Sequence, residues 1–245
     1  MQLHGPMMTN NKDDINMEEV FSRAELLLGT DAIEKLHNSH VAVFGVGGVG
    51  GYAAEALVRT GVGTLDIIDG DVVCESNLNR QIISLRSTIG MPKAEVFAKR
   101  AKDINPNVNI NTFSCFYTAE NADEFDLKKY DYIVDAIDML SAKTELIKRA
   151  TDCDVKIISS MGAGNKLDPT RFEVTDIYKT TMCPLAKKLR KELRALGVQK
   201  LDVVYSTEPP SRVSAGPVGS IASVVSVAGM ILANTIVMRL SGLNI

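Results

Sequence analysis

The chain has 245 residues, of which 45% are hydrophobic and 23% are charged, so it is long and apolar enough for one large α/β domain. Its formal net charge of −3 excludes a global electrostatic attraction to nucleic acid or to a membrane. The four cysteines form no C-x-x-C pair, which argues against structural zinc and disulfides and favours a reducing, cytoplasmic setting.

Residues 1–17 are polar, lack the apolar core of a signal peptide, and are expected to form a mobile tail. After this tail the sequence predicts strands that alternate with helices. Such an alternation predicts a Rossmann-like, doubly wound α/β fold with a mainly parallel sheet and helices on both faces. The expected helices cover residues 18–28, 31–37, 52–59, 92–104, 121–127 and 141–151, and the expected strands cover 40–44, 64–69, 108–113, 130–137 and 155–160.

A C-terminal extension follows this core. It is expected to hold a short antiparallel part, with strands over 172–177 and 203–206, and a basic helix over 184–196. Residues 218–238 carry no charge but many small polar side chains, and they favour a buried core or interface helix over a membrane span. We therefore expect a single domain over 18–245, with a nucleotide-binding core at about 40–164 and a substrate- or dimer-side extension at about 165–245.

A glycine-rich turn follows the strand at 40–44. Gly45 permits a tight turn, Gly47 lets the backbone approach a phosphate, and Gly50 allows close packing of helix and strand, with Gly48 between them. The strand at 64–69 ends in Asp69, at the spacing expected of an acid that binds a ribose hydroxyl. The combination predicts nucleotide binding at the start of the next helix.

The polar loop after Asp69 is the most informative stretch. Asn77 and Arg80, three residues apart, can both face a polyphosphate, since the arginine fork matches phosphate oxygens. The alternative is a solvated loop whose asparagines hold turns.

Several motifs occur together in a fixed order: the Gly-x-Gly-Gly-x-Gly loop, the strand-end Asp69, Ser-Asn-Leu-Asn-Arg-Gln at 76–81, Gly-Met-Pro-Lys at 90–93, and Asp-Ala-Ile-Asp at 135–138. This set resembles the ubiquitin-activating-enzyme superfamily, in its bacterial branch of small adenylyltransferases, over about residues 21–164. The resemblance implies that Asp69 binds the ribose of ATP and that Asn77, Arg80 and Lys93 bind its phosphates, with Gln81 and the glycines 45, 47, 48 and 50 in the same site.

The same resemblance implies that Asp138 binds Mg²⁺, and that Arg80, Lys93 and Asp138 are catalytic. It also implies that Arg23 reaches the ATP of a neighbouring subunit, which requires a homodimer. Lys93 and Arg23 have an alternative as ordinary exposed side chains, and Asp138 has one as a helix cap, with Ser141 competing for that position. Met139 stands where the family usually has asparagine.

The second half resembles the tRNA threonylcarbamoyladenosine dehydratases of that superfamily. The matching stretches are residues 176–180, 184–190 and 205–209, whereas the paired C-x-x-C zinc site of enzymes that activate sulfur carriers is missing. Positive charge gathers in the basic helix and suits contacts with RNA phosphates, unless the helix is merely a solvated surface. Its charged members are Lys187, Lys188, Arg190, Lys191 and Arg194. Cys183 is expected to begin this helix rather than to act in catalysis.

The function implied is ATP-dependent adenylation of the carboxylate of threonylcarbamoyladenosine in tRNA, followed by cyclisation with net loss of water. ATP and Mg²⁺ are the expected cofactors, without zinc, and a sulfur-relay protein is a possible partner. Three alternatives stay open: an adenylyltransferase for a ubiquitin-like sulfur carrier, an NAD(P)-dependent oxidoreductase, and a non-catalytic RNA-binding scaffold.

Overall fold

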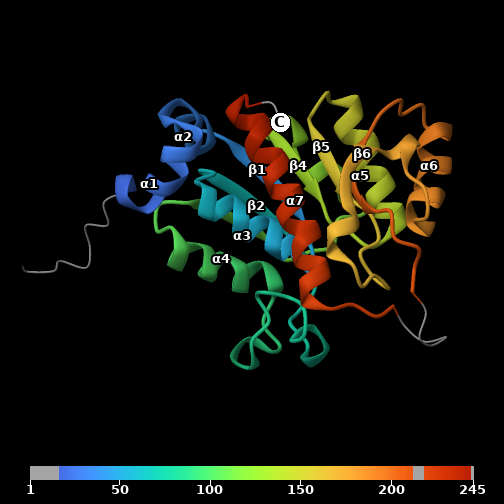
Figure 1. The fold of residues 1–245 in the computed structure, drawn as a ribbon, viewed down its shortest axis with the longest axis horizontal. Coiled ribbons are helices and arrows are strands. Elements are labelled where there is room, and N and C mark those ends of the chain that lie inside the picture. The colour runs from blue at the N-terminus through green and yellow to red at the C-terminus, as the bar shows by residue number, and fades with distance from the viewer. Residues whose placement is uncertain (1–16, 212–217, 244–245) are drawn as a thin grey trace, which may run out of the picture.

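The computed structural model describes residues 17–211 and 218–243, so the expected mobile tail falls almost wholly outside the described residues. Seven strands form one sheet in the order β3-β2-β1-β4-β5-β7-β6 (Figure 1). Six strands run parallel, and β6 pairs antiparallel with β7. The expected Rossmann-like sheet and its short antiparallel extension are confirmed.

The elements follow the predicted order closely. The strands are β1 (His40–Phe44), β2 (Thr64–Ile68), β3 (Asn109–Phe113), β4 (Tyr132–Asp135), β5 (Ile157–Ser160), β6 (Phe172–Asp176) and β7 (Asp202–Ser206). The helices are α1 (Met17–Leu28), α2 (Thr30–His37), α3 (Gly50–Thr60), α4 (Lys93–Ile104), α5 (Leu140–Asp152), α6 (Pro184–Ala195) and α7 (Ala222–Ser241).

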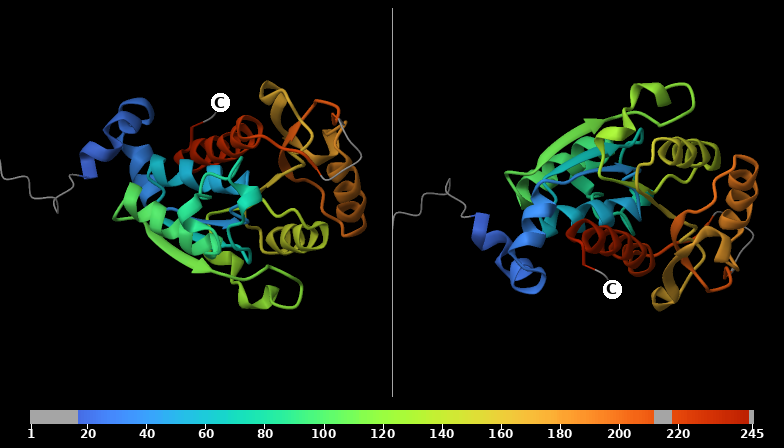
Figure 2. Two further views of the ribbon diagram at one scale, coloured as in Figure 1. Left: turned by 90° about the horizontal axis from the view of Figure 1, so that it is seen from below. Right: turned by 90° about the horizontal axis from the view of Figure 1, so that it is seen from above.

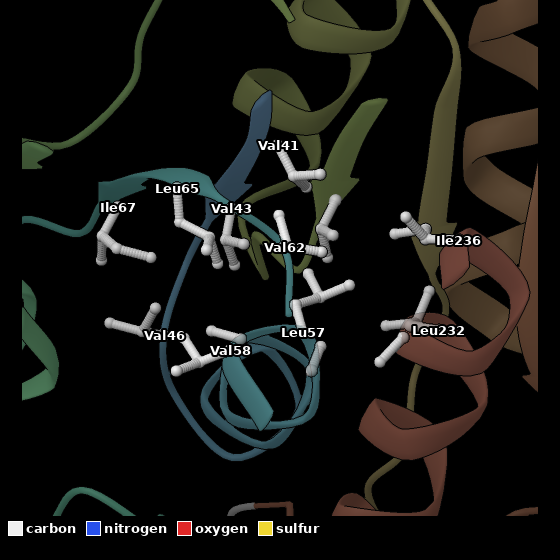
Figure 3. Close-up of a cluster of buried hydrophobic side chains, with 14 of the residues drawn as sticks. Val41, Val43, Val46, Leu57, Val58, Val62, Leu65, Ile67, Leu232 and Ile236 are labelled. Atoms are coloured by element: carbon white, nitrogen blue, oxygen red, sulfur yellow. The ribbon is translucent and has the colours of Figure 1, made fainter. Parts of the chain in front are cut away.

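Alternate residues of each central strand face opposite sides of the sheet and build two cores. Val41 and Val43 of β1 pack with α3, α4 and α7 on one side (Figure 3), while Ala42 and Phe44 pack with α5 on the other. A third cluster joins α5 and α6 to β7. Figure 2 shows the resulting three layers, with α7 and α5 on opposite faces of the sheet.

Helix α7 is the uncharged stretch of the sequence. Among the described helices it alone has the length and apolar composition that a membrane span needs. One side of it, including Val224, Leu232 and Ile236, is fully buried in the core beside α3. The expectation of a core helix is therefore confirmed for that side.

Two predicted elements are corrected. Residues 121–127 do not form one α-helix. Ala122–Glu124 and Leu127–Lys129 are two separate 3₁₀ turns. At the start of the second turn, the Asp126 carboxylate accepts the backbone N–H of Lys128. Strand β4 ends at Asp135 rather than at residue 137. The two residues that follow leave the sheet and turn along the carboxyl edge.

The carboxyl ends of the parallel strands meet at one edge of the sheet, which is where ligands bind in open α/β folds. The loops at 45–50, 69–71, 136–139 and 160–164 follow β1, β2, β4 and β5 there. Residues 72–92 leave this edge as a protruding lobe, seen at the bottom of Figure 1. An antiparallel bridge between Val72 and Pro92 closes the lobe at its base.

Candidate functional site

A cavity of about 560 Å³ opens at this edge, between the loops that follow β1, β2, β4 and β5. Nearly every residue that the sequence assigned to the nucleotide lines it, although these residues come from different parts of the chain. They are Gly45, Gly47, Gly48, Asp69, Asn77, Arg80, Gln81, Lys93 and Asp138.

The glycine loop can adopt its path only without side chains. Gly45 has φ +88°, and a Cβ atom there would lie 2.8 Å from the carbonyl oxygen of Ala136. A Cβ atom at Gly50 would lie 1.8 Å from the carbonyl oxygen of Gly45. The loop therefore runs tightly against the end of β4, and α3 begins at Gly50, directly after the cavity-lining Gly47, Gly48 and Val49.

Asp69 directly follows β2, and its side chain contacts the glycine loop that follows β1. One carboxylate oxygen accepts the backbone N–H of Val46 and the other accepts that of Asp71, both at 2.8 Å. Burial raises the pKa of this carboxyl above its ordinary value, and the two N–H groups oppose that rise. The side chain is fixed in place, and each oxygen keeps a lone pair for a ligand hydroxyl.

Lys93 is not the exposed lysine of the alternative interpretation. Its side chain is 5% exposed, and its Nζ donates to Asp71 Oδ2 at 2.7 Å. The backbone carbonyl of Asp71 also accepts the N–H of Lys93 at 3.0 Å. Asp71 had no role in the sequence interpretation, yet it joins the carboxylate of Asp69 to the ammonium of Lys93 at the base of the lobe.

The lobe directs three polar side chains into the cavity. Asn77 is buried and its Oδ1 accepts the backbone N–H of Cys74, whereas Arg80 donates to the carbonyl of Ser76 and to Asn79 Oδ1. Gln81 is buried beside Gly47, and its Oε1 has no hydrogen-bond partner among the described residues. An unpaired buried acceptor costs stability, so this atom is suited to accept a donor from a ligand.

Asp138 is exposed at the cavity and does not cap a helix. Residue 139 is the N-cap of α5 and no side chain caps it, so neither Asp138 nor Ser141 has that role. No group of three potential metal-ligating side chains occurs in the described part of the chain. One exposed carboxylate at the cavity nevertheless fits Mg²⁺, which is commonly held by one or two carboxylates together with substrate phosphates.

Sequence reasoning missed a buried polar network beneath the cavity. Lys143 and Asp135 are both fully buried and paired at 2.7 Å, and Ser159 donates to the same carboxylate. The only signal was an acid at the end of an apolar strand and a lysine one helical turn into α5. Neither local pattern indicates that the two side chains meet.

Arg23, predicted for the site, lies away from this cavity, and Cys183 has the role in a helix start that the sequence indicates. Arg23 is exposed on α1, which packs on α2 and α3 away from the lobe (Figure 1). Cys183 caps α6, where its Sγ accepts the backbone N–H of Ala186, as expected for a helix start.

The basic helix is confirmed with one correction. Lys187, Lys188 and Lys191 are exposed on α6, but Arg190 turns inward and donates to the carbonyl and hydroxyl of Thr180. Leu185 in the first turn of α6 lines the cavity. The exposed cations therefore begin close to the cavity and lead away from it.

A family model described as "ThiF family" matches residues 21–245. The chain belongs to the ThiF family. The tRNA threonylcarbamoyladenosine dehydratase of Bacillus subtilis (strain 168) is 43% identical over 238 residues, covering 90% of this chain and 94% of that protein. The enzyme of that name from Escherichia coli (strain K12) is 41% identical over 196 residues, covering 77% of this chain and 73% of that protein.

Solved structures agree with this membership. The crystal structure of the Escherichia coli dehydratase in complex with ATP has a TM-score of 0.87 and 35% sequence identity, covering 92% of this chain and 95% of that one. The family resemblance that the motifs indicate is thus confirmed. The family match also includes the C-terminal part of the chain, up to residue 245.

Proposed function

We propose that this ThiF-family protein is an ATP-dependent tRNA threonylcarbamoyladenosine dehydratase. The carboxylate of the threonyl group attacks the α-phosphate of ATP, pyrophosphate leaves, and an acyl-adenylate forms. An atom of the carbamoyl group then displaces AMP and closes a ring, with net loss of water. The observation that carries the proposal is one cavity in which the glycine loop, Asp69 and two cations meet.

The residues of this chain bind, orient and neutralise charge. Asp69 accepts hydroxyls of the ribose, and the N–H groups at the start of α3 face the phosphates. Arg80 and Lys93 neutralise the charge that develops on the phosphates during displacement, with Asn77 and Gln81 as polar neighbours. Asp138 would hold Mg²⁺, which when bound would stabilise negative charge on phosphate oxygens.

RNA binding is assigned to the exposed cations of α6. Lys187, Lys188 and Lys191 make no ion pair with any described carboxylate, so they are available to phosphates. The helix starts at the cavity, so RNA lying along it would have its modified base near the ATP. The fold from residue 18 onward would act as a single domain.

We also propose that two copies form a dimer in which Arg23 enters the partner's site. Within its own chain Arg23 does not line the cavity. It lies on α1 next to Leu26 and Leu27, which are 81% and 83% exposed. Exposed leucines on a helix suit burial against another protein surface. A sulfur-relay protein is the further partner in this proposal.

The test is mass spectrometry of tRNA nucleosides after incubation of threonylcarbamoyladenosine-containing tRNA with the protein, ATP and Mg²⁺. Loss of one water from the modified nucleoside, with release of AMP, is expected. An unchanged nucleoside with full ATP binding would contradict the proposal. A nicotinamide-dependent oxidoreductase would release no AMP.

A further inference from the structure

Beneath the cavity, three side chains from different elements form a closed polar network. Lys143 of α5 donates to Asp135 Oδ2 at 2.7 Å, to Ser159 Oγ at 3.0 Å and to the carbonyl of Ser160 at 3.1 Å. The three donors of the ammonium are thereby used. Ser159 Oγ donates to the same Asp135 oxygen at 2.5 Å, and Asp135 Oδ1 accepts the N–H of Ile137 at 3.2 Å. Asp135, Lys143 and Ser159 are fully buried.

This network holds two walls of the cavity. Ile137 and Asp138 line the cavity shortly after Asp135, and Ser160 and Gly162 line it shortly after Ser159. Lys143 bonds both segments, through Asp135 on one side and through Ser159 and the carbonyl of Ser160 on the other, and the hydrogen bond from Ser159 to Asp135 joins the same segments directly. The network therefore fixes the separation between the loop after β4 and the loop after β5.

Energetics argue against stability as the reason for such a network. Two charges removed from water lose hydration that their attraction barely restores, and well-packed apolar replacements of a buried ion pair are often neutral or stabilising. Core positions between β4, β5 and α5 would otherwise be filled by aliphatic side chains, as their neighbours Val134, Ile158 and Leu146 are. What the polar network supplies is direction, because hydrogen bonds orient the backbone groups of Ile137 and Ser160.

We propose that Lys143, together with Asp135 and Ser159, is a positioning residue that sets the Asp138 loop against the wall at 160–164 during ATP-dependent activation. This rests on the proposed function. The network touches neither substrate nor nucleotide. It acts through Asp138 and through the backbone that faces the reacting groups, where a misplacement of about 1 Å can lower the rate by about 10²-fold.

The test replaces the network with apolar side chains of similar size: Asp135→Leu, Ser159→Ala and Lys143→Met together. We expect a folded protein whose melting temperature stays within about 3 °C of the native one, since no buried charge is left unpaired. Its kcat for AMP formation with modified tRNA should fall by about 10²-fold, while KM for ATP changes by less than about threefold. Amide hydrogen exchange in 136–139 and 160–164 should become faster.

A matched control replaces another ion pair, Glu55→Leu with Arg100→Met, in which the glutamate is buried and the arginine side chain is 34% exposed; its members do not line the cavity and lie 2.6 Å apart. This control should leave kcat unchanged, whatever its effect on the melting temperature. Should the triple variant fail to fold, Ser159→Ala alone removes one link and leaves the buried charges of Asp135 and Lys143 paired. It should lower kcat by about three- to tenfold, as expected for the partial weakening of a positioning network.

Native exchange rates in both loops, or a triple variant as active as the native protein, would overturn the inference. If the native protein itself forms no dehydrated nucleoside, the proposed function fails. The exchange measurement still decides whether Lys143 holds the two loops.

Discussion

Lys93 Nζ and Asp71 Oδ2 lie 2.7 Å apart, and the two partners differ sharply in exposure: the lysine side chain is 5% exposed and the aspartate 54%. The buried ammonium thus faces a counter-ion on the rim of the cavity. Phosphate oxygens entering the cavity can share or replace this carboxylate without leaving the charge unpaired. A lysine in the first turn of α4 is unfavourable for the helix dipole. The Asp71 carboxylate offsets that cost, and a bound phosphate would do the same.

We predict that Lys93→Met and Arg80→Ala each lower the rate of ATP-dependent AMP release by roughly 10²–10³-fold, the effect typical of deleting one preorganised transition-state donor. Methionine keeps much of the length of the Lys93 stem, so the fold should stay intact. Lys99→Met, at an exposed position two turns along the same helix, is the control and should be fully active. The phosphate assignment would be wrong if pyrophosphate exchange survived both changes.

The exposed cations of α6 make a separate prediction about RNA. The double substitution Lys188→Ala with Lys191→Ala should raise KM for tRNA by about tenfold and reduce the slope of log affinity against log salt by about 2, because each lysine is expected to neutralise one phosphate. KM for ATP should not change, since neither residue lines the cavity. Lys99→Ala with Lys102→Ala on α4 makes the same charge change elsewhere. Equal effects of the two pairs would point to net charge rather than to a binding surface.

Asp66 predicts how stability depends on pH. Burial alone would raise the pKa of this carboxyl, but hydrogen bonds from Asn111, Lys129, His40 and Tyr130 outweigh burial and lower it. A lowered pKa in the folded state means that the carboxylate stabilises the fold above about pH 4, and that this contribution disappears as the pH falls further.

Asp66→Asn should therefore cost about 1–3 kcal/mol of unfolding free energy at pH 7, because the donors around it are deprived of a charged acceptor. The difference from the native protein should shrink below about pH 4. Urea titrations at pH 7 and at pH 3.5 measure both values. Asp152→Asn, in an exposed pair with Lys148, is the control and should change little at either pH. A gap that stays constant with pH would contradict the assignment.

How much of the site could be read from the sequence depends on how local each feature is. The glycine loop and Asp69 belong to one βαβ unit, whose turn and spacing fix their places before any other strand is added. Lys93 was predictable as a member of a short motif, but its partner Asp71 was not. That pairing follows from the bridge at the base of the lobe, which joins Val72 to Pro92 and so brings their neighbours together.

The network under the cavity was beyond sequence reasoning for a similar reason. Asp135, Lys143 and Ser159 meet only because β4 and β5 are neighbours in register and α5 packs over both. Strand order is a property of the whole sheet. The failed helix at 121–127 has the opposite cause: its local pattern was helical, but Phe125 and Leu127 are each drawn into the core beside Phe44 and fix a tighter path.

Arg23 allows the strictest test of the shared site. If it serves a partner's ATP, then Arg23→Ala and Lys93→Met each inactivate a homodimer, but by damage to opposite sides of one active site. A mixed dimer of the two variants contains one site with both defects and one site with neither. Co-expression of the two variants with two different affinity tags, followed by purification on both tags, yields the mixed dimer.

The purified mixed dimer should have about half the native activity per dimer, because one of its two equivalent sites is intact. Each homodimeric variant should have almost none. An inactive mixed dimer would show that Arg23 acts within its own chain or only supports α1. Lys93→Met paired with Arg80→Ala is the matched control: both residues line the cavity of a single chain, so every mixed dimer holds two damaged sites and should stay inactive.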